Sequence, residues 1–512
     1  MPTKILSAAL NGLDAVIVAV EADSGGGDFG RITIVGLPDT AVSEARERVR
    51  SALRHSGFPY PQRKITVNLA PADLKKHGPA YDLPIAVSIL ALKNRLAFDP
   101  AKSLIAGELS LDGSTRPLNG ALSIAMAAKQ AKIKNLFLPA ANVAEAGLIK
   151  NLKIFPVENL NQLILHLQNK QRLSAWSGDQ RQAKKSPVAK ERGNTVNLSE
   201  ISGQEHAKRA LEITAAGGHN LLFFGPPGSG KTLLAKSMPS ILPKLNTQEK
   251  LEITKIYSAA GELKNQAGLI LSRPFRSPHH SASGIALIGG GSQPRPGEIS
   301  LAHRGVLFLD EFPEFSRAAL ENLRQPLEDG EISISRAAAS LKFPAKFMLI
   351  AAMNPCPCGY FGDKSRTCSC GPKQIAAYRR RLSGPIIDRI DLHVEVPRIN
   401  LEKINREKNP ENSALVRKRI EAARNIQAAR FKKQNFSTNA EMINAAIKDF
   451  CLLDLAGQRL LRQAAEKINL SARSYFRVLK LARTIADLAQ EKNILNSHLA
   501  EALQYRPKFP AL

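Results

Sequence analysis

Aromatic residues, cysteines and acidic residues are all scarce in this chain of 512 residues. Phe, Tyr and Trp together make up 5% of it, so a surface dense in base-stacking rings is not expected. No apolar run approaches the roughly 18 residues that a membrane-spanning helix needs. Asp14, Glu21 and Asp23 interrupt the stretch where a signal peptide would carry its apolar core. We therefore expect a cytoplasmic protein without a membrane partner.

Acidic residues fall far short of basic ones. The chain has 72 Lys and Arg against 45 Asp and Glu, which gives a formal net charge of +27 and a pI near 10.0. Such a surplus suggests a polyanionic partner, with nucleic acid first and an anionic membrane second. A basic surface that merely keeps the protein soluble is the alternative. The length suggests about two to four globular domains.

Five cysteines are too few for a disulfide framework, but four of them lie close together in the sequence. Two C-x-C pairs are separated by nine residues. Two thiolate pairs closed by a short loop suit tetrahedral Zn²⁺, although C-x-x-C is the commoner spacing. A redox pair and an iron–sulfur cluster are the alternatives. The candidate zinc ligands are Cys356, Cys358, Cys368 and Cys370.

A polar, basic stretch over residues 169–195 divides the chain. It carries seven Lys and Arg against two acids and has no apolar period, which is typical of a solvated linker. Residues 1–168 alternate short apolar segments with helix-forming stretches, which predicts an α+β or α/β domain. Residues 196–400 contain short, wholly apolar strands typical of a buried parallel sheet, and residues 401–512 are expected to be helical. The predicted strands are Ile32–Val35, Ile65–Leu69, Leu136–Leu138, Leu221–Phe224, Val306–Leu309 and Phe347–Ala352.

Residues 225–232 fit the phosphate-loop pattern G-x-x-x-x-G-K-[ST]. An apolar strand runs into the motif and a helix-forming stretch follows it, as the pattern requires. The loop N–H groups would close around phosphate oxygens, with Lys231 reaching the β- and γ-phosphates and the Thr232 hydroxyl ligating Mg²⁺. We therefore expect ATP and Mg²⁺ as cofactors. The binding positions are Gly225, Pro226, Pro227, Gly228, Ser229, Gly230, Lys231 and Thr232.

Polar side chains follow two further apolar strands. Asp310 and Glu311 come directly after the strand over residues 306–309, and Asn354 follows the strand over residues 347–352. A carboxylate at the end of a buried strand is costly unless it serves an ion, so we assign Asp310 to Mg²⁺. Glu311 would polarise the attacking water as general base, and Asn354 would orient the water or the γ-phosphate.

With these motifs the sequence resembles the AAA+ ATPases, and within them a bacterial competence family of the magnesium-chelatase-like branch. The resemblance implies an AAA+ core followed by a helical lid. Arg389 matches the arginine finger that acts on a neighbouring subunit, which implies a homo-hexameric ring, and Arg473 matches the second sensor that touches nucleotide from the lid. A salt bridge of Arg389 to Asp388 or Asp391 is the alternative. The motifs span residues 203–212, 215–220, 273–280, 289–298 and 354–359.

The alternating segment from Glu331 to Lys342 predicts a β-hairpin just before the Asn354 strand. In related ring motors such hairpins face the central pore and grip DNA. The resemblance therefore makes Arg336, Lys342 and Lys346 candidate DNA contacts. An ordinary exposed hairpin with basic residues is an equally good alternative.

The first 168 residues resemble the proteolytic domain of Lon-type proteases, on the segments 77–83, 106–111 and 116–120. Lon-type catalysis uses a serine activated by a lysine. Ala80 stands where the serine is expected and Leu122 at or near the position of the lysine. Neither side chain can act as nucleophile or base, so we expect this domain to organise a ring or bind DNA.

Three functions follow in order of preference. The first is an ATP-driven hexameric DNA helicase or branch-migration motor that acts on recombination intermediates during natural transformation, with branched or forked DNA and recombination proteins as partners. The second is a chelatase-type ATPase that remodels a protein partner. The third, an ATP-dependent protease, is disfavoured by Ala80 and Leu122.

Overall fold

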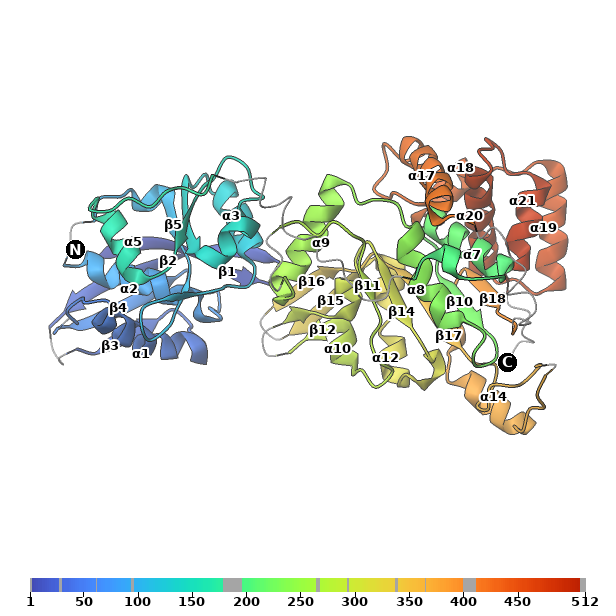
Figure 1. The fold of residues 1–512 in the computed structure, drawn as a ribbon, viewed down its shortest axis with the longest axis horizontal. Coiled ribbons are helices and arrows are strands. Elements are labelled where there is room, and N and C mark those ends of the chain that lie inside the picture. The colour runs from blue at the N-terminus through green and yellow to red at the C-terminus, as the bar shows by residue number, and fades with distance from the viewer. Residues whose placement is uncertain are drawn as a thin grey trace.

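The computed structural model describes residues 2–26, 30–60, 62–93, 96–177, 196–263, 268–291, 294–336, 339–363, 365–398 and 411–506. Two lobes lie side by side, an N-terminal one in blue to teal and a larger one in green to red (Figure 1). The predicted linker lies outside the described residues from 178 to 195. Among the described helices, none is both long and apolar enough to cross a membrane.

The N-terminal lobe is a seven-stranded sheet with helices on both faces. Its strand order is β3-β4-β2-β1-β5-β8-β9, antiparallel around β2 and parallel elsewhere. In β4, Ile65, Val67 and Leu69 are buried and alternate with less buried residues, which gives the period of two expected of a strand. Helices α1, α2 and α5 pack on one face and α3 and α4 on the other. The elements are β1 (Thr3–Asn11), β2 (Asp14–Gly25), β3 (Ile32–Val35), α1 (Thr40–His55), β4 (Lys64–Ala70), α2 (Asp82–Ala91), β5 (Ser103–Ile105), β6 (Glu108–Leu109), β7 (Thr115–Arg116), α3 (Ala121–Gln130), β8 (Asn135–Pro139), α4 (Val143–Ala146), β9 (Lys153–Val157) and α5 (Leu160–Leu167).

The larger lobe is built on five parallel strands in the order β11-β14-β17-β10-β18. The central strands β14 and β17 are buried at every position, because helices cover both faces of the sheet. This confirms the expected α/β fold. The elements are α7 (Glu205–Gly217), β10 (Leu221–Phe224), α8 (Lys231–Ile241), α9 (Thr247–Ala260), β11 (Phe275–Arg276), α10 (Gly284–Ile288), β12 (Gly289–Gly290), β13 (Arg295–Pro296), α11 (Glu298–Leu301), β14 (Val306–Leu309), α12 (Arg317–Glu321), α13 (Arg324–Asp329), β15 (Glu331–Arg336), β16 (Ala339–Pro344), β17 (Met348–Met353), α14 (Pro372–Arg380), α15 (Gly384–Ile387) and β18 (Leu392–Glu395).

The last described segment is wholly helical and packs against one face of that sheet. Its apolar side chains join α7, α8 and β10 in one core, and these helices form the orange and red group in Figure 1. The helices are α17 (Ser413–Arg430), α18 (Asn444–Phe450), α19 (Leu455–Lys467), α20 (Ala472–Leu488) and α21 (Asn496–Gln504).

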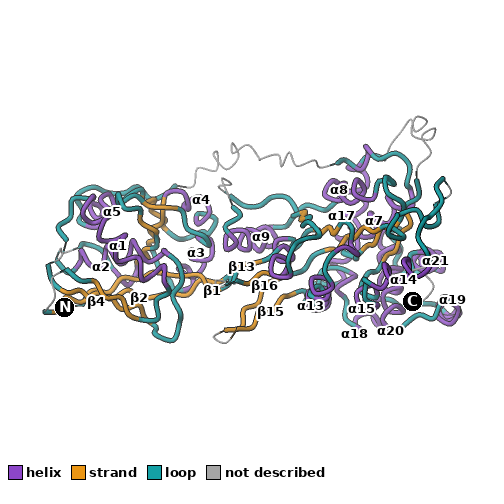
Figure 2. Tube along the Cα trace, turned by 90° about the horizontal axis from the view of Figure 1, so that it is seen from below, coloured by secondary structure: helices purple, strands orange, loops and turns teal. Residues whose placement is uncertain are grey.

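Two substructures extend from the larger lobe. The predicted hairpin forms from β15 and β16, paired in antiparallel register with Ile334 opposite Leu341, and Figure 2 shows it reaching beyond its neighbours. The segment that carries the four cysteines and α14 projects from the opposite end, at the lower right of Figure 1.

The two lobes meet where α3 packs on α9. The Gly120 N–H donates to the Ser258 carbonyl at 3.1 Å, and the Ser258 hydroxyl donates to the buried carboxylate of Glu145. Lys255 on α9 pairs with Asp14 at 2.5 Å. Polar contacts from α9 thus hold both the start of α3 and the β1–β2 turn.

Candidate active site

The phosphate loop lies at the carboxyl end of β10, between that strand and α8. Gly225 has no room for a side chain, because a Cβ atom there would lie 2.2 Å from the Val396 carbonyl oxygen. Lys231 and Thr232 occupy the first turn of α8. The sequence prediction of strand, loop and helix is therefore confirmed in this order.

Lys231 points back into its own loop. Its Nζ donates to the carbonyls of Gly225 and Pro226 at 2.7 and 2.8 Å and to Asn354 Oδ1 at 3.2 Å. Burial lowers the pKa of Lys231 to about 8, although the nearby Asp310 carboxylate favours the charged form. The structure thus brings together the predicted loop lysine and the predicted strand-end amide.

The Mg²⁺ candidates also meet. The Thr232 hydroxyl donates to Asp310 Oδ2 at 2.8 Å, across the gap between α8 and β14. The hydroxyl of Ser229 is buried and has no hydrogen-bond partner among the described residues. A hydroxyl and a carboxylate side by side suit a hard divalent cation, and a buried unpaired hydroxyl in the loop suits a phosphate oxygen. The residues present therefore fit Mg²⁺ and a nucleoside triphosphate.

Glu311 lies at the edge of this group. Its backbone φ of 50° is unusual for a residue with a side chain, and its carboxylate is 56% exposed. The Glu311 N–H donates to Asp310 Oδ1 at 3.0 Å. His280 Nδ1 lies 3.0 Å from Glu311 Oε2, a contact that sequence reasoning did not anticipate. His280 ends the 273–280 motif, but nothing in the sequence spacing pairs it with Glu311.

Arg389 and Arg473 both contact the carboxylate of Glu328, away from the phosphate loop. The guanidinium of Arg389 donates to Glu328 on α13 and, at 2.5 Å, to the Pro385 carbonyl, while Arg473 Nη2 lies 3.1 Å from the same Glu328 oxygen. The side chain of Arg389 is 6% exposed, and that of Arg473 is 59% exposed. Of the two salt-bridge partners considered from the sequence, Asp388 and Asp391, the second pairs with Arg477 at 2.5 Å.

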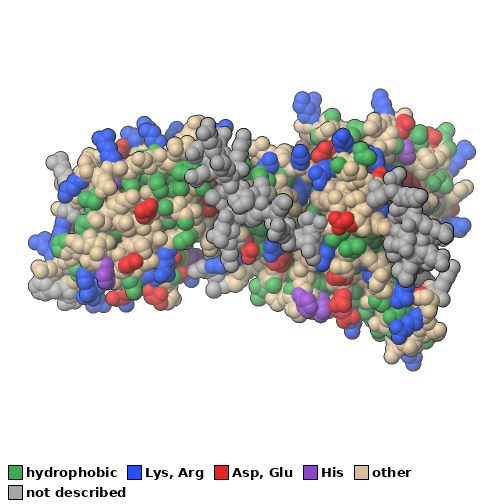
Figure 3. Space-filling view, viewed as in Figure 1, with side chains coloured by type: hydrophobic (Ala, Val, Ile, Leu, Met, Phe, Trp, Pro, Cys, Tyr) green, Lys and Arg blue, Asp and Glu red, His purple; other side chains and the backbone are tan. Residues whose placement is uncertain are grey.

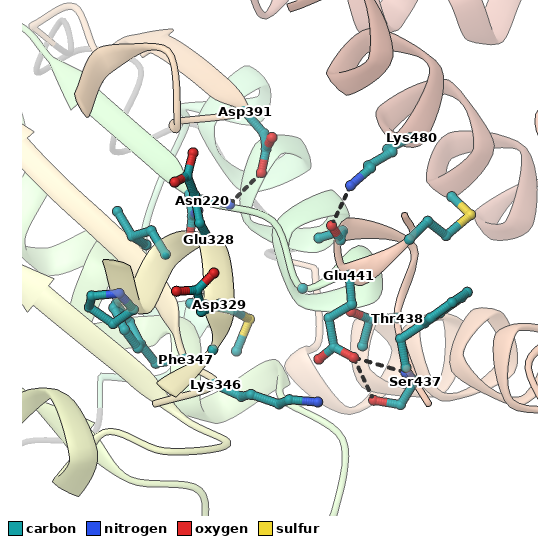
Figure 4. Close-up of a pocket in the computed structure, with 18 of the residues that line it drawn as sticks. Asn220, Glu328, Asp329, Lys346, Phe347, Asp391, Ser437, Thr438, Glu441 and Lys480 are labelled. Atoms are coloured by element: carbon teal, nitrogen blue, oxygen red, sulfur yellow. Dashed lines mark hydrogen bonds between the residues drawn. The ribbon is translucent and has the colours of Figure 1, made fainter. Parts of the chain in front are cut away.

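Glu328 and Arg473 border a cavity of about 690 Å³ between the sheet and the C-terminal helices. Asn220 and Asp391, which directly precede β10 and β18, line it in Figure 4. The cavity therefore lies at the amino ends of the parallel strands, whereas the phosphate loop lies at their carboxyl ends. Lys346 also lines the cavity, and it follows the hairpin rather than belonging to it.

The four predicted zinc ligands form one cluster, with all four Sγ atoms within 4.8 Å of one another. Cys356 Sγ lies 3.4 Å from Cys358 Sγ and 3.7 Å from Cys368 Sγ. Zn–S bonds of about 2.3 Å in a tetrahedron place sulfurs about 3.8 Å apart, so the cluster is compatible with structural zinc. Gly359 directly follows Cys358 in the chain. A Cβ atom at Gly359 would lie 2.6 Å from Pro227 Cδ, so the cysteine segment packs on the phosphate loop.

Comparison with known proteins identifies the family. The profile described as magnesium chelatase, subunit ChlI, matches residues 197–404, and two further ChlI profiles match residues 20–142 and 410–506. The chain is 45% identical to the competence protein ComM of Haemophilus influenzae, over 98% of this chain and 97% of that one. It is 44% identical to YifB of Escherichia coli, over 97% and 95% of the two chains. The chain belongs to the ComM/YifB family of magnesium-chelatase-like AAA+ proteins.

The similarity to magnesium chelatase itself is narrower. The 38 kDa magnesium-chelatase subunit of Cereibacter sphaeroides is 25% identical over 174 residues, which cover 31% of this chain and 52% of that subunit. ComM/YifB membership implies ATP and Mg²⁺ as cofactors, in agreement with the geometry around Lys231 and Asp310.

In this ComM/YifB chain the Lon-like dyad positions contain no reactive group. Ala80 lies in a short 3-10 turn, and Leu122 is buried in the first turn of α3, where its N–H donates to Glu145 at 2.7 Å. Glu145 is the carboxylate that also contacts α9 of the larger lobe. The region where a catalytic lysine would lie is thus part of the contact between lobes.

Two of the three predicted DNA contacts of this family member belong to the hairpin, and the third lies outside it. Lys342 lies on β16, is 66% exposed and pairs with Glu331 across the hairpin at 2.5 Å. Arg336 ends β15, and its side chain lies outside the described residues. Lys346 lines the cavity instead. The hairpin is confirmed, and its binding of DNA stays a prediction.

Proposed function

We propose that this chain is an ATP-driven DNA motor that assembles into a homo-hexameric ring and migrates or unwinds branched DNA during natural transformation. The similarity to ComM over nearly the full length of both chains carries this proposal. The net charge of +27 supports it, because a motor that tracks along DNA must contact many phosphates. Recombination proteins are the partners that such a role implies.

The chemistry follows from the side chains at the carboxyl edge of the sheet. Bound Mg²⁺–ATP would supply the γ-phosphoryl group that is transferred to water. Lys231 would hold the phosphates, Thr232 and Asp310 would hold the metal, and Glu311 would take the proton of the attacking water on a carboxylate oxygen. His280 fixes the orientation of that carboxylate from 3.0 Å away. Asn354, which contacts Lys231, positions the lysine or the water.

Arg389 and Arg473 act on a neighbouring subunit in this proposal. Both arginines contact Glu328, which lines the cavity at the amino edge of the sheet. The phosphate loop of the same chain lies at the opposite, carboxyl edge. In a ring, that edge can face the nucleotide of the next subunit, where a guanidinium offsets charge on the γ-phosphate. Arg473, expected to touch nucleotide from its own lid, is therefore reassigned to the same interface as Arg389.

DNA passes through the centre of the ring in this proposal, gripped by the β15–β16 hairpin. Lys342 is exposed on it and would exchange Glu331 for a phosphate. Arg336 at the end of β15 is the second contact. Lys346 is not proposed as a DNA contact, because it lines the cavity.

An unwinding assay tests the function. We expect the chain to bind forked and four-way DNA at low salt, to hydrolyse ATP faster in its presence, and to separate strands in an ATP-dependent way. DNA-independent ATPase with no affinity for either substrate would contradict the proposal. The same result would favour the second candidate, a chelatase-type ATPase that acts on a protein partner, which the three ChlI profile matches favour.

We also propose that the four-cysteine cluster holds one structural Zn²⁺. Metal analysis of the purified chain should give about one zinc per chain. The double substitution Cys356→Ser, Cys358→Ser should remove it, because two of four ligands are lost. The buried Cys451, which lies apart from the cluster, provides a control: Cys451→Ala should retain the zinc. Unchanged zinc content in the double variant would end this proposal.

A further inference from the structure

The cysteine-bearing projection carries aromatic rings among arginines. We name it the Cys module and define it as residues 356–363 and 365–381 together with Arg398. Phe361 is 47% exposed, and the guanidinium of Arg379 lies 5.3 Å from its ring centroid. Tyr360 lies between Arg366 and Arg398, at 4.3 and 5.4 Å. In a chain with 5% aromatic residues, this is a local concentration of rings and guanidinium groups.

The module is also strongly basic. Asp363 is the one acid among its described residues, and Arg398 pairs with it at 3.4 Å. Arg366, Lys373 and Arg380 are exposed. Figure 3 shows Lys and Arg side chains gathered with hydrophobic ones over the projecting end at the lower right, where Figure 1 places α14. An exposed ring among exposed cations is the chemistry that binds a single nucleic-acid strand.

The segment under this surface contains the four-sulfur cluster and contacts the nucleotide site. The four-sulfur cluster ties Cys356 and Cys358 to Cys368 and Cys370, and so holds the loop that presents Phe361 and Arg366. At its base, the close packing of Gly359 on Pro227 joins the module to the phosphate loop. The hairpin β15–β16 belongs to a different part of the lobe (Figure 2). A strand held here is therefore a second DNA contact, next to the nucleotide.

We propose that the Cys module binds single-stranded DNA. Phe361 stacks on an unpaired base, and Arg366, Lys373 and Arg380 contact the flanking phosphates. Displacement of the module by the strand is transmitted through Gly359 to the phosphate loop, which makes ATP hydrolysis respond to the strand. This inference rests on the proposed function for the identity of the polyanion, and it adds a site outside the pore.

The first test removes the ring from the full-length chain. Phe361→Ala should weaken binding of a thymidine 30-mer by roughly fivefold to 150-fold, because a base stacked on an aromatic ring contributes about 1–3 kcal/mol. Phe361→Trp should restore it. Leu455→Ala, which removes an apolar side chain that is 73% exposed on α19, is the matched control and should leave affinity unchanged. Anisotropy measures affinity, and zinc content and melting temperature verify the fold of each variant.

The second test removes charge. The double variant Lys373→Ala, Arg380→Ala should lower the slope of log affinity against log salt by about 1.4, since each phosphate contact to a single strand contributes about 0.7. Lys432→Ala, Lys433→Ala removes equal charge from exposed positions after α17 and should leave the slope unchanged. Both module variants should also lose stimulation of ATP hydrolysis by the 30-mer while keeping the DNA-free rate.

Several outcomes would overturn the inference. Equal loss in the control variants would show a general charge effect, and equal competition by duplex DNA or polyglutamate would show that no base is stacked. Unchanged 30-mer affinity of Phe361→Ala, in a chain whose unaltered form unwinds junctions, would remove the module site and leave the proposed function intact. Absence of DNA binding and unwinding by the unaltered chain would instead remove the proposed function, and the inference with it.

Discussion

The carboxyl and amino edges of the five-stranded sheet carry different groups of functional side chains. At the carboxyl ends of the strands, Lys231, Thr232, Asp310 and Asn354 contact one another and form a nearly complete site within one chain. At the amino ends, Arg389 and Arg473 contact Glu328 beside a wide cavity. The carboxyl edge presents side chains for a nucleotide bound by the same chain. At the amino edge, two arginines pair with the Glu328 carboxylate, which a stronger anion could displace.

In the proposed ring, each sheet would serve two nucleotides, its own at the carboxyl edge and a neighbour's at the amino edge. A phosphate loop needs backbone N–H groups at a helix N-terminus, which parallel strands present at their carboxyl ends. The cations at the opposite edge cannot reach that loop through the sheet. They become useful when a second copy presents its nucleotide, so assembly would complete the site.

Arg389→Ala should reduce ATP hydrolysis by about 10³-fold or more, with little change in ATP binding, because a finger arginine acts mainly on the transition state. Mixing this variant with Lys231→Ala should restore part of the rate, since some interfaces then pair an intact arginine with an intact loop. Steady-state ATPase of mixed rings measures this. No recovery at any mixing ratio would place both edges at the same nucleotide and break the comparison.

Glu311→Gln should reduce hydrolysis by roughly 10²- to 10⁴-fold while retaining ATP, because the general base is lost and the phosphate contacts remain. Glu314→Gln, in the neighbouring turn and paired with Arg381, is the matched control and should hydrolyse ATP normally. Single-turnover hydrolysis and nucleotide retention measure the two effects. Full activity in Glu311→Gln would remove this residue from its assigned role.

ATP affinity should fall by up to about tenfold per pH unit above pH 8, because the ammonium of Lys231 is then lost. Burial lowers the pKa of Lys231 from 10.5 to about 8 in the folded chain, so its positive charge is present below pH 8 and disappears as the pH rises. Phosphate favours the charged form, so the bound state retains the proton longer. Titration calorimetry between pH 7 and 9 in two buffers measures affinity and proton uptake, and a flat profile would contradict the assignment.

Glu328→Gln should raise DNA-free ATP hydrolysis severalfold, because the arginines lose the carboxylate that competes with the neighbouring nucleotide. Asp329→Asn changes the next residue on α13 and removes the same charge. Asp329 pairs with no arginine among the described residues, so this variant should leave the rate unchanged. Steady-state ATPase compares the two. A decrease in Glu328→Gln would mean that Glu328 holds the arginines in their working position rather than away from it.

Local patterns predicted much of the carboxyl edge. The strands before Gly225 and Asp310 form at the predicted residues. A short apolar run that ends at a glycine or an acid is compatible with few structures other than a buried strand. The β15–β16 hairpin also forms as alternation predicted. Strands β1, β2, β5, β9 and β18 were not predicted from the sequence, and β18 carries His393 and Glu395 among its apolar residues.

The sequence by itself determined the chemistry of the nucleotide site. Phosphate, metal and water each need particular side chains at fixed places along a strand or loop. These local requirements produce a recognisable motif in the sequence. The tertiary structure alone decided which distant groups meet: His280 with Glu311, Glu328 with two arginines, and Gly359 with Pro227. These contacts join residues 31 to 145 positions apart in the chain. Their partners are selected by packing in three dimensions, which imposes no spacing along the sequence.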